Sequence, residues 1–291
     1  MSDSYDDMDI SEIRNCLRVW RESNERKSEE VLTIWNRYQE KFSKMPVNEK
    51  YIALEQVFYA ALDCHDYNEA GFILAIFMQD FGPSSVRVFR HRIALLEAEE
   101  DYDSALTHLD SMIKMDETNA ALRKRRVAIF KAQGLIVEAV KELVDYLKKF
   151  MSDAEAWQQL CTLYQQLGEY SRAAFCAEEL LLHQPHNHLV HQRLADLRYT
   201  MGGAENMELA KAYYCQSLKL NPNNMRSLLG LFLVTNNLLN HYKSSGNSSK
   251  RKEIWRLSQW VQSQVSRKQR DARADNSPAL TNMMLALAIT E

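Results

Sequence analysis

The chain has 291 residues, of which 46% are hydrophobic, and it contains only eight glycines and five prolines. This scarcity of helix breakers, and the lack of convincing period-two runs of β-branched residues, predicts an all-α protein. The net charge of −3 argues against a general nucleic-acid-binding protein, which normally carries a dominant basic field.

Apolar runs in the chain are short. The longest, Leu228–Val234 and Met283–Ile289, fall far short of the roughly 20 residues that a membrane-spanning helix needs. The N-terminal segment lacks the basic and apolar regions of a signal peptide, and the five scattered cysteines include no C-x-x-C pair. We therefore expect a cytoplasmic protein with free thiols.

The first 44 residues divide into two parts. Residues 1–9 are acidic and polar, and we expect them to be disordered. Residues 10–24 and 28–44 carry apolar side chains at helical spacing and predict a helical hairpin. This hairpin lacks the small-residue pattern found further along the chain, which is typical of the capping unit of a repeat protein.

A small residue then recurs at a nearly constant interval. Intervals of 35, 34, 34 and 37 residues separate the alanines Ala70, Ala105, Ala139, Ala173 and Ala210. Prolines follow three of these alanines by twelve or thirteen residues, at Pro83, Pro185 and Pro222. A period near 34 with a central small residue is typical of the tetratricopeptide helix-turn-helix. The alanine allows the second helix to cross closely over the first, and the proline ends the second helix.

The unit from Ala154 to Asn187 shows the whole pattern. Trp157, Leu160 and Tyr164 give its first helix one apolar face, and Gly168 begins the turn to the second helix. One such hairpin cannot bury its own apolar face, so the units must stack on one another. The sequence therefore predicts a tetratricopeptide-type α-solenoid.

After the fifth alanine the pattern becomes irregular. Residues 225–240 predict the first helix of a sixth unit, and residues 243–249 read as a flexible loop. A capping helix is predicted for about residues 250–270, and its apolar face is expected to contain Ile254, Leu257, Trp260, Val261 and Val265. The predicted solenoid thus covers residues 10–270 as a single domain, and residues 271–291 form a tail that is either flexible or docked on a partner.

Basic residues are concentrated in two places. Four are consecutive at residues 123–126, where they must point to different sides of a helix and cannot all face one partner. Nine more lie between Lys243 and Arg273, against only Glu253 and Asp271. Most such runs are solvated faces, and contact with an anionic or membrane surface is the alternative for the second run.

Catalytic motifs are absent from the sequence. It contains no glycine-rich phosphate loop, no G-x-S-x-G and no H-E-x-x-H, so we expect no enzyme activity and no cofactor. A cluster of four histidines is the one pattern with metal-ligand spacing: His183, His186, His188 and His191. It straddles the turn around Pro185, and we interpret these residues as turn and cap residues and expect no metal.

A tetratricopeptide solenoid usually presents a groove to a segment of another protein. Positions 2, 5, 9 and 12 of each first helix face that groove because they share one side of the helix. In the third to fifth units they give a polar, mildly basic set of candidate partner-binding residues: Lys124, Lys131, Gln158, Thr162, Gln165, Gln192 and Tyr199. The alternative is a solvated groove, with partners on the convex face or at the termini.

A chaperone-binding adaptor is a second functional hypothesis. Such adaptors hold a terminal carboxylate with lysine and asparagine side chains, and Lys124 occupies the lysine position. Ala128 and Gln159 stand where asparagines are required, and each lost hydrogen bond to a buried charge costs about 1–3 kcal/mol. An RNA-binding helical repeat is a third hypothesis, which the net charge disfavours.

Several stretches outside the packing positions resemble one family. They are residues 20–24 (Trp-Arg-Glu-Ser-Asn) with 28–29, 55–57 with 60–63, 128–134, 173–176 with 178–180, the turn 185–189 (Pro-His-Asn-His-Leu), 199–206, 224–226 and 230–231. Across residues 15–265 the chain resembles subunit 2 of the endoplasmic reticulum membrane protein complex. The apolar tail after about Ser277 departs from the resemblance.

The resemblance implies a non-catalytic scaffold on the cytosolic face of the endoplasmic reticulum membrane. Members of this family are expected to support insertion of transmembrane helices, including those of tail-anchored proteins. They bridge the membrane-embedded subunits 3 and 5 to the soluble subunit 8 or 9, so membrane association would be indirect, through partners. The resemblance also implies a turn-locking or contact role for the turn at residues 186–188.

Overall fold

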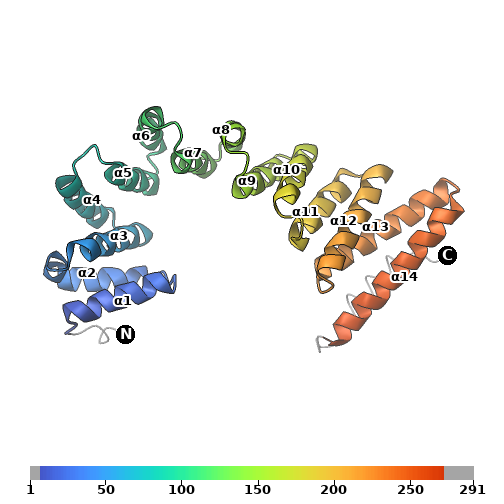
Figure 1. The fold of residues 1–291 in the computed structure, drawn as a ribbon, viewed down its shortest axis with the longest axis horizontal. Coiled ribbons are helices and arrows are strands. Elements are labelled where there is room, and N and C mark those ends of the chain that lie inside the picture. Colours follow the sequence, from blue (N-terminus) through green and yellow to red (C-terminus); the bar gives the residue numbers. More distant parts are fainter. Residues whose placement is uncertain (1–6, 272–291) are drawn as a thin grey trace. The chain divides into compact units, whose positions relative to one another are not determined.

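The computed structural model describes residues 7–271, with side chains as far as Lys268. This part of the chain contains 14 α-helices and no strand, as the sequence predicts. The helices form two compact units, Met1–Gln133 and Gly134–Glu291, which we describe separately (Figure 1). The boundary falls in the turn within the repeat that contains Ala139. The first helix of that repeat therefore belongs to the first unit, and its second helix belongs to the second unit.

In the first unit each helix packs against the next one along the chain, and α1 also contacts α3. Its helices are α1 (Ile10–Glu22), α2 (Ser28–Ser43), α3 (Val47–Asp63), α4 (Tyr67–Phe81), α5 (Val86–Ala98), α6 (Tyr102–Met115) and α7 (Ala120–Ala132). The predicted leading hairpin corresponds to α1 and α2. Large buried side chains such as Phe42, Phe58 and Phe77 fill the core between these helices.

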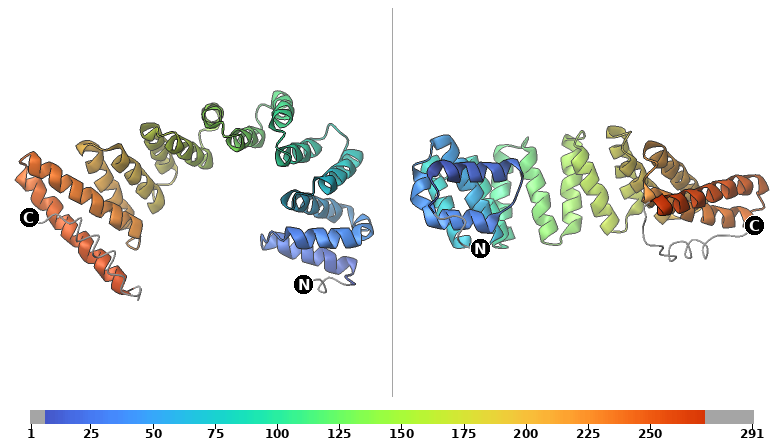
Figure 2. Two further views of the ribbon diagram at one scale, coloured as in Figure 1. Left: turned by 180° about the vertical axis from the view of Figure 1, so that it is seen from behind. Right: turned by 90° about the horizontal axis from the view of Figure 1, so that it is seen from below.

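The second unit has the same sequential packing, which Figure 2 shows from two further sides. Its helices are α8 (Ile136–Lys149), α9 (Ala154–Gln166), α10 (Tyr170–His183), α11 (His188–Met201), α12 (Ala204–Leu220), α13 (Met225–Ser244) and α14 (Ser248–Asp271). All five alanines of the repeat pattern, two in the first unit and three in the second, are 0% exposed. Complete burial of so small a side chain is what a close helix crossing requires.

Turns between helices follow the sequence signals. Gly134 and Gly168 adopt positive φ of 76° and 74° between the helices of their repeats, a conformation that costs glycine little. Asp66, Asp101 and Asp153 precede helices α4, α6 and α9, and each side chain accepts a hydrogen bond from a first-turn amide. These caps satisfy backbone donors that a helix start leaves open.

The two ends of the described chain differ in detail from the sequence analysis. Met8 and Asp9, placed there in a disordered segment, contact α1 and α2: the Met8 amide donates to Tyr38 Oη at 3.1 Å, and Lys41 Nζ donates to the Met8 carbonyl at 2.6 Å. The predictions for residues 1–6 and 272–291 lie outside the described residues.

The flexible loop predicted for residues 243–249 is shorter in the structure. Helix α13 continues to Ser244 and α14 begins at Ser248, which leaves three connecting residues. Gly246 turns the chain with a φ of 71°, and Asn247 Oδ1 accepts a hydrogen bond from the Lys250 amide at 3.2 Å. Serine, whose composition suggested a loop, is tolerated in the terminal turns of a helix.

Trp260 is a second correction. The sequence analysis placed it on the apolar face of the last helix, but its side chain is 47% exposed. The predicted face residues Ile254, Val261 and Val265 are buried, together with Ser258, at a spacing of three and four residues. Because neighbouring residues differ by about 100° around a helix, burial of Val261 turns Trp260 outward.

The basic run at residues 123–126 points to several sides of α7, as the sequence predicts. Arg125 forms an ion pair with Glu97 of α5, and Arg126 pairs with Asp110 of α6 at 2.7 Å. Arg123 is mostly buried and donates from Nε to the Glu117 carbonyl at 3.2 Å. These three arginines therefore bind α5, α6 and the preceding turn.

A glycine in α13 allows close packing on α12. A Cβ atom built on Gly230 would lie 2.6 Å from Cε1 and Oη of Tyr214. The Tyr214 ring is 2% exposed, and its hydroxyl donates to Asp196 Oδ1 at 2.5 Å, so the ring has little freedom to move. Burial and this hydrogen bond both raise the pKa of Tyr214.

We therefore expect Gly230→Ala to destabilise the protein by roughly 1–3 kcal/mol, as for other overpacked cores. Gly71→Ala is the matched control, since Gly71 lies inside α4 and nothing is within 4 Å of its added Cβ. Replacing a helical glycine by alanine there should stabilise by up to about 1 kcal/mol. Thermal unfolding should show a lower stability than the wild type for Gly230→Ala and an equal or higher stability for Gly71→Ala. Equal stability of the two variants would refute the close packing of Gly230 against Tyr214.

Candidate interaction surfaces

Candidate groove residues from the sequence are divided between the two units. Lys124 and Lys131 lie on α7 of the first unit. The other five lie in the second unit on first helices: Gln158, Thr162 and Gln165 on α9, and Gln192 and Tyr199 on α11. Lys131, Gln158 and Thr162 are exposed, and the remaining four are half-buried.

Within the second unit, four of these residues are joined to partners one repeat further on. Arg193 Nη2 donates to Thr162 Oγ1 at 2.7 Å and to Gln165 Oε1 at 2.6 Å, which links α11 to α9. The other two bonds link α13 to α11: Asn224 Nδ2 donates to Gln192 Oε1 at 2.8 Å, and Asn237 Nδ2 donates to Tyr199 Oη at 2.9 Å. We call this set the polar ladder.

The ladder's donors were not among the residues predicted from the sequence. Arg193, Asn224 and Asn237 stand 28 to 38 residues after their partners, so the repeat period itself was the available signal. Next to the ladder is a hollow of about 450 Å³, where Asp196 accepts from Arg226 Nε at 3.1 Å. The ladder holds polar side chains in fixed positions, which suits recognition of an extended segment by hydrogen bonds.

Of the four histidines, two have exposed side chains and two have ring nitrogens in contact with polar groups of the same unit. His183 and His186 are exposed. Both ring nitrogens of His188 lie 3.1 Å from side-chain amides, those of Asn221 and Asn224, and His191 Nε2 lies 2.9 Å from the Pro185 carbonyl. Among the described residues no group of three His, Cys, Asp or Glu is placed to hold a metal ion. His188 thus connects the start of α11 to the turn before α13.

The second candidate surface is apolar and lies across α8, α9 and α10. A groove of about 450 Å³ opens there, and we call it the apolar groove; it is lined mainly by Val144, Leu147, Met151, Trp157, Leu160 and Phe175. Met151 and Phe175 are 66% and 54% exposed although they are large and apolar. Trp157 stays in place because its Nε1 donates to the Met151 carbonyl at 2.8 Å. A contiguous apolar groove with exposed large side chains is a candidate interaction site.

Basic side chains stand at the rim of the apolar groove. Lys148 and Arg172 line it, and both are exposed. Lys148 pairs with Asp145 of the same helix at 2.7 Å. Arg172 Nε lies 4.0 Å from Glu169, the residue that precedes α10. Exposed pairs of this kind are weak, so both cations are available to an acidic partner.

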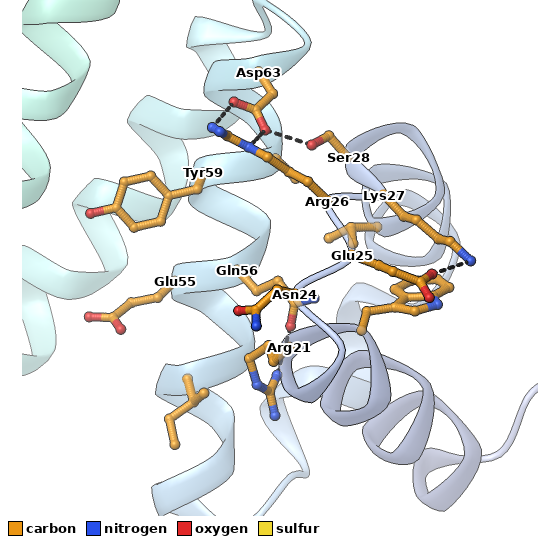
Figure 3. A pocket seen from close by; sticks show the side chains of 14 residues that line it. Arg21, Asn24, Glu25, Arg26, Lys27, Ser28, Glu55, Gln56, Tyr59 and Asp63 are labelled. Carbon is orange, nitrogen blue, oxygen red and sulfur yellow. Dashed lines mark hydrogen bonds and ion pairs between the residues drawn. The ribbon is translucent and has the colours of Figure 1, made fainter. Parts of the chain in front are cut away.

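The third candidate is a polar pocket of about 410 Å³ in the first unit, between the α1–α2 loop and α3 (Figure 3). Arg26 reaches from the loop to Asp63 at the end of α3, donating to both carboxylate oxygens at 2.7 and 2.5 Å. Ser28 Oγ donates to the same carboxylate at 2.7 Å. Burial disfavours the charged form of Asp63, but these hydrogen bonds outweigh it and hold its pKa below the ordinary value.

Residues that carry the family resemblance in the first 63 positions converge on this polar pocket. Its lining includes members of all four stretches in this range: Trp20, Arg21, Asn24, Ser28, Glu55, Gln56, Ala60 and Asp63. Arg21 Nη1 donates to Gln56 Oε1 at 2.7 Å, which ties α1 to α3. The stretches are far apart in sequence, and their meeting indicates that they fix the loop between α1 and α2.

Comparisons with known proteins give the family. A sequence model described as the EMC2 TPR-like repeat domain matches residues 72–219. ER membrane protein complex subunit 2 of Xenopus tropicalis is 40% identical over 267 residues, which is 92% of this chain and 89% of that protein. The chain belongs to the family of ER membrane protein complex subunit 2.

Other relatives agree with membership of the ER membrane protein complex subunit 2 family. The subunit 2 protein of Dictyostelium discoideum is 37% identical over 213 residues, 72% of this chain and 65% of that protein. Among solved structures, the C-terminal part of a TPR repeat-containing protein from Cytophaga hutchinsonii covers 85% of this chain and 95% of its own, with a TM-score of 0.57. At 13% identity this likeness shows the tetratricopeptide fold alone.

The family name places this chain in a complex of the endoplasmic reticulum membrane. None of the helices in residues 7–271 has the length and apolar character to cross a bilayer. Membership of this family implies that other subunits of the complex are partners of the chain.

Beside the polar pocket, His91 is a buried titratable group among aromatic rings. Its ring centroid lies 4.9 Å from that of Phe58 and 4.8 Å from that of Phe77, and its Nδ1 is 2.8 Å from the Arg87 carbonyl. Its Nε2 lies 3.4 Å from Glu55 Oε1, too poorly aligned for a hydrogen bond. Burial lowers the pKa of His91, and the nearby Glu55 carboxylate only partly offsets this.

This lowered pKa predicts acid sensitivity. In the unfolded chain His91 takes up a proton as the pH falls below about 6.5, whereas in the folded chain it stays neutral. The contribution of neutral His91 to the free energy of unfolding is therefore fully present above that pH. It decreases as the pH falls towards the folded-state pKa. We expect the melting temperature to fall less for His91→Phe than for the wild type when the pH is lowered from 7.5 to 5.5. His65→Asn, at an exposed residue with positive φ, should behave like the wild type; an unchanged slope in His91→Phe would contradict the assignment.

Proposed function

We propose that this chain is a non-catalytic scaffold subunit of the ER membrane protein complex, on the cytosolic face of the membrane. In this role it supports insertion of transmembrane helices, including those of tail-anchored proteins. It bridges the membrane-embedded subunits 3 and 5 to the soluble subunit 8 or 9. The observation that carries the proposal is 40% identity to a subunit 2 protein over 92% of the chain.

Two surfaces with different chemistry support a bridging role. The polar ladder of the second unit offers fixed hydrogen-bonding groups to an extended segment, and the apolar groove offers exposed Met151 and Phe175 between basic rim residues. A surface of fixed polar groups and an apolar groove select different partners. A scaffold that joins two kinds of subunit needs such a pair of surfaces.

The first test concerns the predicted groove lysines. Lys124→Glu with Lys131→Glu should weaken assembly, because the segment they contact is expected to be neutral or acidic. Loss of fold is not expected at the exposed Lys131, where substitutions seldom cost more than about 0.5 kcal/mol. Lys44→Glu with Lys114→Glu is the control, since both residues are exposed and the net charge changes equally.

Co-purification of the other subunits with the tagged chain would measure the effect, after circular dichroism has verified folding. Undiminished recovery with the folded groove variant would remove these two lysines from the interface. Recovery of heat-shock chaperones in place of membrane-complex subunits, already with the wild type, would support the alternative of a soluble tetratricopeptide adaptor.

The apolar groove gives an independent test. Phe175→Glu places a charge where a partner's apolar side chains are expected, and burial of an unpaired charge is strongly unfavourable. We expect at least one subunit to be lost from the purified complex, while the stability of the isolated chain changes little because Phe175 is 54% exposed. Met115→Glu is the matched control, an 82% exposed apolar residue outside this groove. Equal subunit recovery in the two variants would show that the groove is not an interface.

A further inference from the structure

Helix α14 is the outermost helix of the second unit (Figures 1 and 2). It packs on α13 through the buried residues Ile254, Ser258, Val261 and Val265. Their spacing of three and four residues defines one face of the helix, so the opposite face points away from the unit. Within the second unit, α13 is the helix against which α14 packs extensively.

The charge on α14 is almost all positive. Between Ser248 and Lys268 there is one acidic residue, Glu253, against six basic ones: Lys250, Arg251, Lys252, Arg256, Arg267 and Lys268. Since the whole chain has a net charge of −3, the residues outside this segment have a more negative net charge than the chain as a whole. A solvated capping helix of a solenoid normally mixes both signs, so this separation of charge calls for a specific explanation.

Three of these cations form a stripe on the outer face. At about 100° per residue, Lys252, Arg256 and Arg267 fall within an arc of about 60°, opposite the buried residues. They form no ion pair or hydrogen bond with any described residue. Lys250 and Lys268 are used within the unit: Lys250 Nζ lies 5.5 Å from the centre of the Tyr242 ring, and Lys268 donates to Asn223 Oδ1 at 2.5 Å.

Trp260 stands beside this stripe, one helical turn after Arg256. Its indole is 47% exposed, although one side of it lines an apolar hollow with Leu218, Leu228 and Leu231. A large aromatic side chain with a polar N–H, placed among cations, is the composition that prefers the headgroup region of a bilayer. The stripe runs about 22 Å along the helix, which suits a helix lying parallel to a membrane surface.

We propose that the outer face of α14 binds directly to an anionic lipid surface. Lys252, Arg256 and Arg267 contact lipid phosphate and carboxylate groups, and Trp260 enters the headgroup layer. This contact goes beyond the bridging function, because it needs no other subunit. It would orient the second unit against the membrane, which none of helices α1–α14 crosses.

Binding of the purified full chain to lipid vesicles tests this proposal. The wild type should sediment with vesicles of phosphatidylcholine containing about 30% phosphatidylserine, and not with phosphatidylcholine alone, because each basic residue near an anionic surface raises binding about fivefold. Lys252→Glu, Arg256→Glu and Arg267→Glu together should therefore reduce binding about 100-fold or more. Trp260→Ala should reduce it by a smaller factor that added salt does not abolish.

The control is Arg90→Glu, Arg92→Glu and Lys114→Glu, three exposed residues of the first unit that change the net charge equally. It should retain most of the vesicle binding. Circular dichroism and co-purification of the other subunits would verify that the α14 variant still folds and assembles, which separates this test from that of the scaffold function.

Three outcomes would overturn the proposal: no binding of the wild type to anionic vesicles, equal binding to neutral ones, or equal loss in both triple variants. Binding of a single-stranded RNA oligonucleotide by the wild type, without vesicle binding and lost in the α14 variant, would instead assign the stripe to nucleic acid.

Discussion

Close contact between successive helices within each unit is the constraint from which the other features follow. The alanines at positions 70, 105, 139, 173 and 210 have no exposed surface, and a larger side chain at any of them would push the helices apart. A hairpin this thin cannot enclose a core of its own, so each one buries its remaining apolar face against the next. Surfaces are consequently built from side chains one repeat apart, as in the polar ladder between α9, α11 and α13.

Much of this architecture was predictable because it depends on period and composition. The alanine interval, the prolines after the second helices and the glycine turns predicted helix positions that the structure reproduces within a few residues. The errors occur where composition and geometry disagree. Serines at 244, 248 and 249 suggested a loop but lie in terminal helical turns. Trp260 was predicted on the apolar face with Val261, but its side chain is 47% exposed.

Interaction surfaces were less predictable for a physical reason. Helical periodicity predicts which side of a helix faces a groove, and it selected Thr162, Gln165, Gln192 and Tyr199, which hydrogen-bond to side chains of the next repeat. The helical period alone does not identify the side chains that bond to them, because Arg193 and Asn224 lie about one repeat later in the sequence. The apolar groove was not predicted for the opposite reason. Met151 and Phe175 are of residue types that usually lie in the core, and only the structure shows that they are exposed.

Contacts between neighbouring repeats also decide how the chain opens. Because each bond of the ladder joins adjacent hairpins only, thermal fluctuations can release helices from an end inward without disrupting distant ones. In the second unit the terminal hairpin, α13 and α14, is also the longest, with helices of 20 and 24 residues against 13 to 17 in α8–α12. Helix α14 packs on α13, and its Ile254, Val261 and Val265 belong to the same buried cluster as Leu228 and Leu231 of α13. The helix that bears the basic stripe therefore also covers the apolar core at this end of the unit.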